Sequence, residues 1–96
     1  MEAGIVLKGT EIKSLRMQTP SLRDGFVDVT SNGKKIEAWL LNAHIAPYSH
    51  GNLSNHDPLR RRKLLLHRNQ LEKMLAAIIQ KGMTIVPTRM YLKDGF

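Results

Sequence analysis

The 96-residue sequence has no cysteine, few aromatic residues and no long apolar run. Without cysteine, a disulfide framework, a zinc ribbon and thiol catalysis are all excluded for these residues. Apolar runs such as Leu75 to Ile79 are far shorter than the roughly 20 residues that cross a membrane. Glu2 and Gly4 stand where a signal peptide would carry basic and apolar residues. We therefore expect one soluble, cytoplasmic domain.

Acidic residues are also scarce: 15 Lys and Arg face 8 Asp and Glu, which gives 15 − 8 = +7 and a sequence pI near 10.2. A basic domain attracts anions, most commonly nucleic acid. The four bases at 60–63 are suited to consecutive phosphates, although such a run can also be a solvated charge cluster. One Trp, two Tyr and two Phe are few aromatic side chains for stacking on the bases of single-stranded nucleic acid. We expect Trp39 in the core. The composition therefore favours recognition of folded RNA by shape and backbone.

The apolar periodicity predicts several strands and two helices. Alternation predicts strands at 2–8, 25–30, 36–41 and 84–92 and a short buried run at 64–66. The pair Asn32-Gly33 predicts a hairpin turn. Residues 36–41 are apolar on most of both faces, which predicts a central strand. A brief helix from a cap at Thr10 to Arg16 and a longer helix from His67 or Asn69 to a stop at Gly82 are predicted. The expected core face of the longer helix consists of Leu71, Met74, Leu75, Ile78 and Ile79.

Histidines are the other candidate reactive groups. His44, His50 and His56 lie near Asp57, and a catalytic zinc takes three protein ligands and keeps one position open. A His-dependent phosphodiesterase is therefore one alternative, but no zinc or nucleophile motif accompanies these residues. The interpretation that these histidines form loop hydrogen bonds or contact phosphate is favoured.

Five segments of the sequence resemble one family. They are residues 2–5, 9–16, 39–45, 47–52 and 55–67, with PYSHGN and NHDP as the most unusual strings. In this order, along the whole chain, they resemble the SmpB family, whose members bind tmRNA in bacterial trans-translation. Arg61 departs from the family, which often carries an uncharged residue at this position.

The resemblance implies a mainly β fold with helices, an OB-fold-like antiparallel β-barrel flanked by helices, over residues 1–96 as a single RNA-binding domain. It implies a protein that is no enzyme, that holds the tRNA-like domain of tmRNA around the elbow and D-arm, and that delivers it to stalled ribosomes. No cofactor or metal is implied, and we expect a monomer that meets no membrane. The alternatives are the phosphodiesterase and a generic single-stranded nucleic-acid-binding OB-fold module.

Eleven residues are the candidate RNA contacts. In the family, the positions that match Glu2, Leu65 and His67 are tied to RNA binding, and the Glu2 carboxylate is suited to accept hydrogen bonds from base or ribose donors. The bases are expected to neutralise phosphates, and the other residues to supply shape and specific hydrogen bonds. The full set is Glu2, Lys13, Arg16, Asn42, His44, Arg60, Arg62, Lys63, Leu65, His67 and Arg68.

Both ends of the sequence lead us to expect a piece of a longer protein. Asp94-Gly95 is a hairpin signal, but its second strand would begin at Phe96, where the sequence ends. A strand is also predicted almost from Met1. Family members continue into a further barrel strand and a basic tail that occupies the decoding centre. The resemblance therefore implies that these 96 residues bind RNA without rescuing ribosomes.

Overall fold

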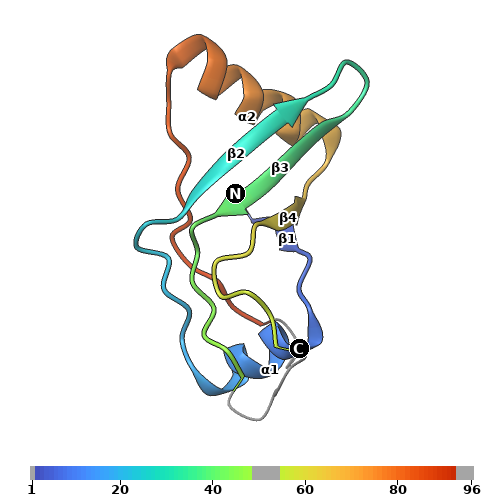
Figure 1. The fold of residues 1–96 in the computed structure, drawn as a ribbon. Helices are drawn as coiled ribbons and strands as arrows, with labels where there is room; N and C mark the ends of the chain where they lie inside the picture. The colour runs from blue at the N-terminus through green and yellow to red at the C-terminus, as the bar shows by residue number, and fades with distance from the viewer. Residues whose placement is uncertain (1, 49–54, 93–96) are drawn as a thin grey trace.

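The computed structural model describes residues 2–48 and 55–92. Its elements in chain order are β1 (Gly4–Ile5), α1 (Gly9–Met17), β2 (Phe26–Ser31), β3 (Ile36–Leu41), β4 (Arg62–Leu65) and α2 (Arg68–Lys81). The strands form one antiparallel sheet in the order β1-β4-β3-β2 (Figure 1). The expected combination of an antiparallel sheet with helices is confirmed. Over the same residues, neither helix is long and apolar enough to cross a membrane.

The β2–β3 hairpin forms where the sequence predicted it. Gly33 has a φ of 90°, which residues with a Cβ atom rarely adopt, and the Asn32 N–H donates to the Lys35 carbonyl at 3.1 Å. β3 lies between β2 and β4. The predicted turn and the central position of residues 36–41 are therefore both confirmed.

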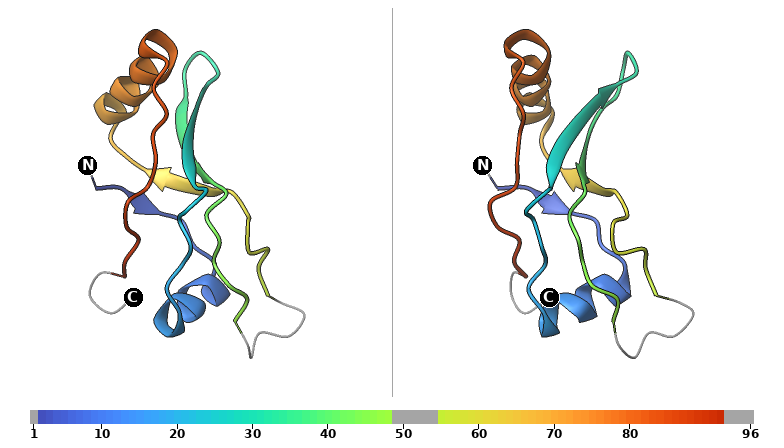
Figure 2. Two further views of the ribbon diagram at one scale, coloured as in Figure 1. Left: turned by 90° about the vertical axis from the view of Figure 1, so that its left-hand side faces the viewer. Right: turned by 60° about the vertical axis from the view of Figure 1, so that its left-hand side comes forward.

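One face of the sheet, the inner face, carries the core. Alternation along β2 and β3 places Val27, Val29, Ala38 and Leu40 on this face, where all four are buried. Met74 of α2 belongs to the same buried cluster. The helix stands alongside the hairpin in both views of Figure 2 and covers this part of the inner face.

α2 agrees closely with the predicted helix. It begins at Arg68 with His67 at the cap position, and the His67 N–H donates to Oε1 of Gln70 at 3.1 Å. Gly82 ends the helix in the left-handed conformation, with a φ of 63°. Ile79, expected in the core, is 70% exposed, because the stripe that packs on the sheet ends at Ile78. The predicted face was wrong at this one position.

α1 begins earlier than predicted. Oε1 of Glu11 accepts the backbone N–H of Lys8 at 2.7 Å, so Lys8 occupies the cap position. Thr10, the predicted cap, lies inside the helix, and its hydroxyl contacts His56. The predicted cap was wrong because the capping group is a carboxylate reaching back from the helix.

Residues 83–92 do not form the predicted strand. Within the described chain, this segment makes one backbone bridge, in which the Val27 N–H donates to the Ile85 carbonyl at 2.8 Å. Pro87 has no N–H to donate, and Val86 is 58% exposed. The segment instead runs from the edge of β2 to β1, where the Tyr91 hydroxyl donates to Glu2.

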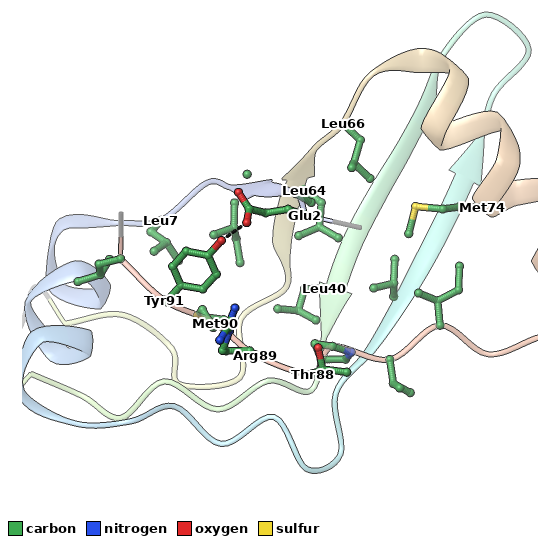
Figure 3. Close-up of a pocket in the computed structure, with 18 of the residues that line it drawn as sticks. Glu2, Leu7, Leu40, Leu64, Leu66, Met74, Thr88, Arg89, Met90 and Tyr91 are labelled. Atoms are coloured by element: carbon green, nitrogen blue, oxygen red, sulfur yellow. Dashed lines mark hydrogen bonds between the residues drawn. The ribbon is translucent and has the colours of Figure 1, made fainter. Parts of the chain in front are cut away.

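The sheet of the described residues is open. β1 and β4 run across the direction of β2 in Figure 2, and the sheet curves around an apolar groove of about 990 Å³. Leu40, Leu64, Met74 and Met90 line this groove (Figure 3). The expected closed barrel is therefore not confirmed, and the hairpin predicted at residues 94–96 lies outside the described residues.

Candidate nucleic-acid interface

A buried carboxylate holds two of the four consecutive bases. Glu11 has no exposed surface, and its two oxygens lie 2.5 Å from Nη2 of Arg60 and 2.5 Å from Nη2 of Arg62. Arg62 is equally buried and donates further to the carbonyls of Ala43 at 2.8 Å and Pro58 at 3.2 Å. We call Glu11, Arg60 and Arg62 the arginine clasp. It ties α1 to β4 and to the backbone on either side of the 49–54 segment.

The clasp changes the expected role of the basic run. Arg62 has no surface to offer a phosphate, because its guanidinium is used entirely inside the protein. Its predicted phosphate contact is therefore corrected to an internal ion pair. The Arg60 side chain keeps 23% of its surface exposed, and Arg61 and Lys63 lie outside the clasp. Two members of the run, Arg60 and Arg62, therefore hold the fold together, whereas Arg61 and Lys63 can contact a ligand.

Glu11 is held ionised by its neighbours. Burial alone raises the pKa of this carboxyl group, but the hydrogen bonds from Arg60, from the backbone of Lys8 and from Arg62 outweigh that effect. The pKa of Glu11 consequently lies below its ordinary value of 4.5. With two guanidinium groups and one carboxylate, the clasp keeps a charge of 2 − 1 = +1, which reaches solvent through Arg60.

α1 carries two exposed bases next to the clasp. Lys13 and Arg16 are one helical turn apart and therefore share a side of the helix. Nζ of Lys13 lies 5.6 Å from the centre of the Tyr48 ring. Because Glu11 is anchored by the clasp, the position of Lys13 and Arg16 on the surface is set by the buried ion pair.

The alternation of β4 separates its side chains into two sets. Leu65 is 55% exposed, so the predicted buried run at 64–66 is wrong at its middle position. Nζ of Lys63 lies 3.1 Å from Oε2 of Glu37, in a pair that is partly exposed. The strand therefore presents a base and an apolar side chain outward while Arg62 and Leu64 face the interior.

The start of α2 adds His67 and Arg68, both exposed. Nε of Arg68 lies 3.0 Å from Oε1 of Glu72, and Nη1 donates to the Lys34 carbonyl at 2.9 Å. This bond joins the first turn of the helix to the tip of the β2–β3 hairpin. These two predicted residues lie beside the hairpin, away from α1 in Figure 1.

Glu2 lies at the rim of the apolar groove. Its carboxylate accepts a hydrogen bond from the Tyr91 hydroxyl, drawn as a dashed line in Figure 3. The guanidinium of Arg89 lies 5.1 Å from the centre of the Tyr91 ring. The hydrogen bond to Glu2 raises the pKa of Tyr91 above its ordinary 10.0, because it stabilises the protonated phenol.

Asn42 and His44 follow β3 toward α1. Asn42 is exposed with a φ of 58°, a left-handed conformation that asparagine tolerates better than most residues. His44 is exposed and pairs through its backbone with Ser21 at 2.9 Å. The eleven predicted residues are thus spread along the molecule: some lie with α1, others lie at the start of α2, and Glu2, Lys63 and Leu65 lie at β1 and β4, which Figure 1 shows between the two helices.

His56 is a structural histidine. Its Nε2 lies 2.8 Å from the Ile45 carbonyl, which can only accept, so Nε2 carries the proton. In the neutral ring, Nδ1 then accepts from the Thr10 hydroxyl at 2.9 Å. Both nitrogens are engaged, and residues 2–48 and 55–92 contain no group of three side chains that could hold a metal ion. His50 lies outside the described residues, and the zinc interpretation gains no support.

Sequence reasoning missed three features of this surface. Glu11 matched no motif, because a capping box normally begins with Ser or Thr and Lys8 stands at that position. Tyr91 carried no signal, because its contact with Glu2 joins opposite ends of the described chain. Trp39, expected in the core, is only half-buried and lies beneath Arg61.

In this small basic protein, the described residues form one open sheet and two helices. A family model described as SmpB protein matches residues 1–96. An SsrA-binding protein of Levilactobacillus brevis is 54% identical over 96 residues, which are 100% of this chain and 59% of that protein. An SsrA-binding protein of Latilactobacillus sakei subsp. sakei is 58% identical over 95 residues, 99% of this chain and 58% of that protein.

A solved structure described as "tmRNA-SmpB: a journey to the center of the bacterial ribosome" superposes with a TM-score of 0.75. The two chains are 45% identical, and the match covers 98% of this chain and 63% of the other. The chain therefore belongs to the SmpB family. It spans about 59% of the length of the Levilactobacillus brevis protein.

Proposed function

We propose that the protein binds the tRNA-like domain of tmRNA around the elbow and D-arm and delivers it to stalled ribosomes in trans-translation. The observation that carries this proposal is the family match over residues 1–96, together with relatives named SsrA-binding proteins and a structural neighbour described as tmRNA-SmpB. The sequence charge of +7 supports it, because RNA is a polyanion. The action is recognition, with no bond made or broken.

The proposed interface uses exposed side chains. Lys13, Arg16 and Arg68 would neutralise phosphates, and Arg60 would contribute the residual charge of the clasp. Lys63, which is partly exposed and paired with Glu37, would add a weaker phosphate contact. Shape and specific hydrogen bonds would come from the remaining candidates. These are Glu2, Asn42, His44, Leu65 and His67. Arg62 acts in this proposal as a positioning residue, because it fixes α1 through Glu11.

The proposal includes the architecture and setting of the domain. We take residues 1–96 as one RNA-binding domain whose open sheet is part of an OB-fold-like barrel. The curved sheet and the approach of β1 to residues 85–92 through the Glu2–Tyr91 hydrogen bond support this view. We propose that the domain acts as a monomer in the bacterial cytoplasm.

A gel shift with the tRNA-like domain of tmRNA, compared with an ordinary tRNA, tests the proposal. We expect tighter binding to the tmRNA domain and a steep loss of affinity with salt. Each of Lys13→Ala and Arg16→Ala should flatten the log–log salt slope by about 0.7–0.9, the contribution of one phosphate contact. Lys81→Ala, at the far end of α2, is the matched control.

Three results would contradict the proposal. They are equal affinity for the tmRNA domain and heparin, competition by polyuridine as effective as that of folded RNA, and a flat salt dependence. Polyuridine competition would indicate a generic single-strand module. Hydrolysis of a phosphodiester, lost on substitution of His50 or His56, would indicate the phosphodiesterase.

A further inference from the structure

The sheet has a second face that α2 does not cover, which we call the outer face. Side chains directly opposite in antiparallel strands share a face, and Trp39 of β3 lies opposite Asp28 of β2 and Lys63 of β4. Their strand neighbours Leu40 and Leu64 line the groove on the inner side (Figure 3). Trp39 and Lys63 therefore point away from the core.

We propose that the outer face binds an unstacked RNA base on the paired side chains of Arg61 and Trp39. The guanidinium carbon of Arg61 lies 4.1 Å from the centre of the Trp39 ring, a close cation–π stack. Trp39 is half-buried and Arg61 is exposed, so the indole lies beneath a guanidinium group that solvent can reach. Bases in single-stranded loops of RNA stack on aromatic rings and on guanidinium planes.

The charges around the stack favour a base over a phosphate. Lys63 is paired with Glu37 at 3.1 Å, and Asp28 stands directly across from Trp39. Two acids therefore accompany two bases on this face, and the local charge of 2 − 2 = 0 gives phosphates no excess attraction. A planar, weakly hydrated guanidinium held over an indole offers stacking instead. This inference rests on the proposed RNA binding and names a surface for it.

The same face also carries Leu65. Residues at positions 61, 63 and 65 alternate with the inward-facing Arg62 and Leu64, and Leu65 is 55% exposed. A base on Arg61 would thus lie two strand positions from the partly exposed Lys63 and four from Leu65. An RNA loop laid along β4 would meet the guanidinium plane, an ammonium group and an apolar side chain in turn.

Trp39 is the single tryptophan of the sequence, so its fluorescence reports on this face. The experiment titrates the protein with the tRNA-like domain of tmRNA and records Trp39 emission and a gel shift in parallel. We expect the emission to change with the same midpoint as the gel shift. Arg61→Ala should weaken binding by about 5- to 150-fold, equivalent to the 1–3 kcal/mol per stacked base. Its salt slope should stay that of the wild type.

Two further variants make the result specific. Arg61→Lys keeps the charge but has no plane, and we expect it to bind nearly as weakly as Arg61→Ala. Arg23→Ala removes an exposed arginine elsewhere and should change affinity by no more than about twofold. A thermal melt of each variant checks that the fold is intact.

The outcomes separate this inference from the proposed function. If the wild-type protein binds no tmRNA domain, both fail. If RNA binds while Trp39 emission and the affinity of Arg61→Ala stay unchanged, the outer face is not the RNA surface, and only this inference is overturned. A salt slope reduced by about one contact in Arg61→Ala, or full rescue by Arg61→Lys, would make Arg61 a phosphate ligand and overturn the stacking. Emission altered by an acidic protein but not by RNA would overturn it in favour of a protein partner.

Discussion

Replacing Glu11 by Gln removes the negative charge of the arginine clasp with little change in shape. The amide oxygen can still accept the Lys8 N–H, so the helix cap is kept. Arg62, with no exposed surface, loses its ionic partner, and breaking a buried pair in this way costs about 3–5 kcal/mol. A domain of this size is stabilised by only about 5–15 kcal/mol. We therefore expect a loss of a large part of the stability.

Urea and thermal unfolding, followed by circular dichroism, measure the effect. A loss of about 3 kcal/mol lowers the melting temperature by about 12–24 °C in a domain of this length. Glu72→Gln is the matched control, since it breaks an exposed Glu–Arg pair one turn apart on α2. Its cost should be about 0.3–0.5 kcal/mol.

A double variant separates the buried charge from other effects of Glu11→Gln. Adding Arg62→Met removes the unpaired guanidinium and should recover part of the lost stability. Recovery stays incomplete because the Ala43 carbonyl loses the Arg62 donor, at about 1 kcal/mol, whereas the Pro58 carbonyl keeps the hydrogen bond from the Ile45 N–H. If Glu11→Gln and Glu72→Gln differ by less than about 0.5 kcal/mol, the buried-pair reasoning is wrong.

The clasp also predicts how the free energy of unfolding decreases at low pH. The folded pKa of Glu11 lies below 4.5 because the hydrogen bonds to it outweigh the effect of burial, whereas the unfolded pKa is near the ordinary value. The stabilisation is therefore complete above pH 4.5 and is lost as the pH falls through the folded pKa. Glu11→Gln should lack this part of the pH dependence.

Three further predictions concern single contacts. His56→Ala leaves the Ile45 carbonyl and the Thr10 hydroxyl without their partner and should cost about 1–3 kcal/mol in urea unfolding; a cost below 0.5 kcal/mol would contradict the buried arrangement. Gly82→Ala forces a residue with a Cβ atom into the left-handed conformation and should lower the stability by about 1 kcal/mol. Thermal melts measure this loss, and an unchanged melting temperature would contradict the cap assignment. Glu2→Gln should move the pKa of Tyr91 down toward 10.0, because the hydrogen bond to the carboxylate is the main cause of its rise; an NMR titration of the phenol resonance checks this, and an unmoved pKa would exclude the contact.

Elements set by neighbours in the sequence were predictable. The hairpin at Asn32-Gly33 follows from residues that accept positive φ, and the stop of α2 at Gly82 follows from the same property. Periodicity predicted a start of α2 at His67 or Asn69, and the helix begins at Arg68 with His67 as its cap; the central position of β3 was also predicted from its apolar pattern. The turn and the two ends of α2 depend on contacts within a few residues, which a single sequence displays, whereas the central position of β3 was visible only as an apolar pattern on both faces.

Features set by distant partners were not predictable from the pattern. Glu11 and Arg62 are 51 residues apart, so neither burial nor pairing could be read from their neighbours. Residues 84–92 have strand periodicity, but Pro87 and the single bridge at Ile85 leave them without a ladder of hydrogen bonds. Ile79 shows the same limit, because the apolar stripe does not reveal where the sheet ends beneath the helix.

The basic run at 60–63 shows how strand alternation changes the meaning of sequence charge. Arg62 faces inward and is neutralised by Glu11, while Arg61 and Lys63 face outward. The clasp accounts for only +1 of the +7, so 7 − 1 = +6 comes from side chains outside it. Four adjacent bases therefore do not act as one phosphate-binding strip. Because side chains alternate along the strand, Arg60 and Arg62 hold α1 in place through Glu11, while Arg61 and Lys63 lie on the outer face.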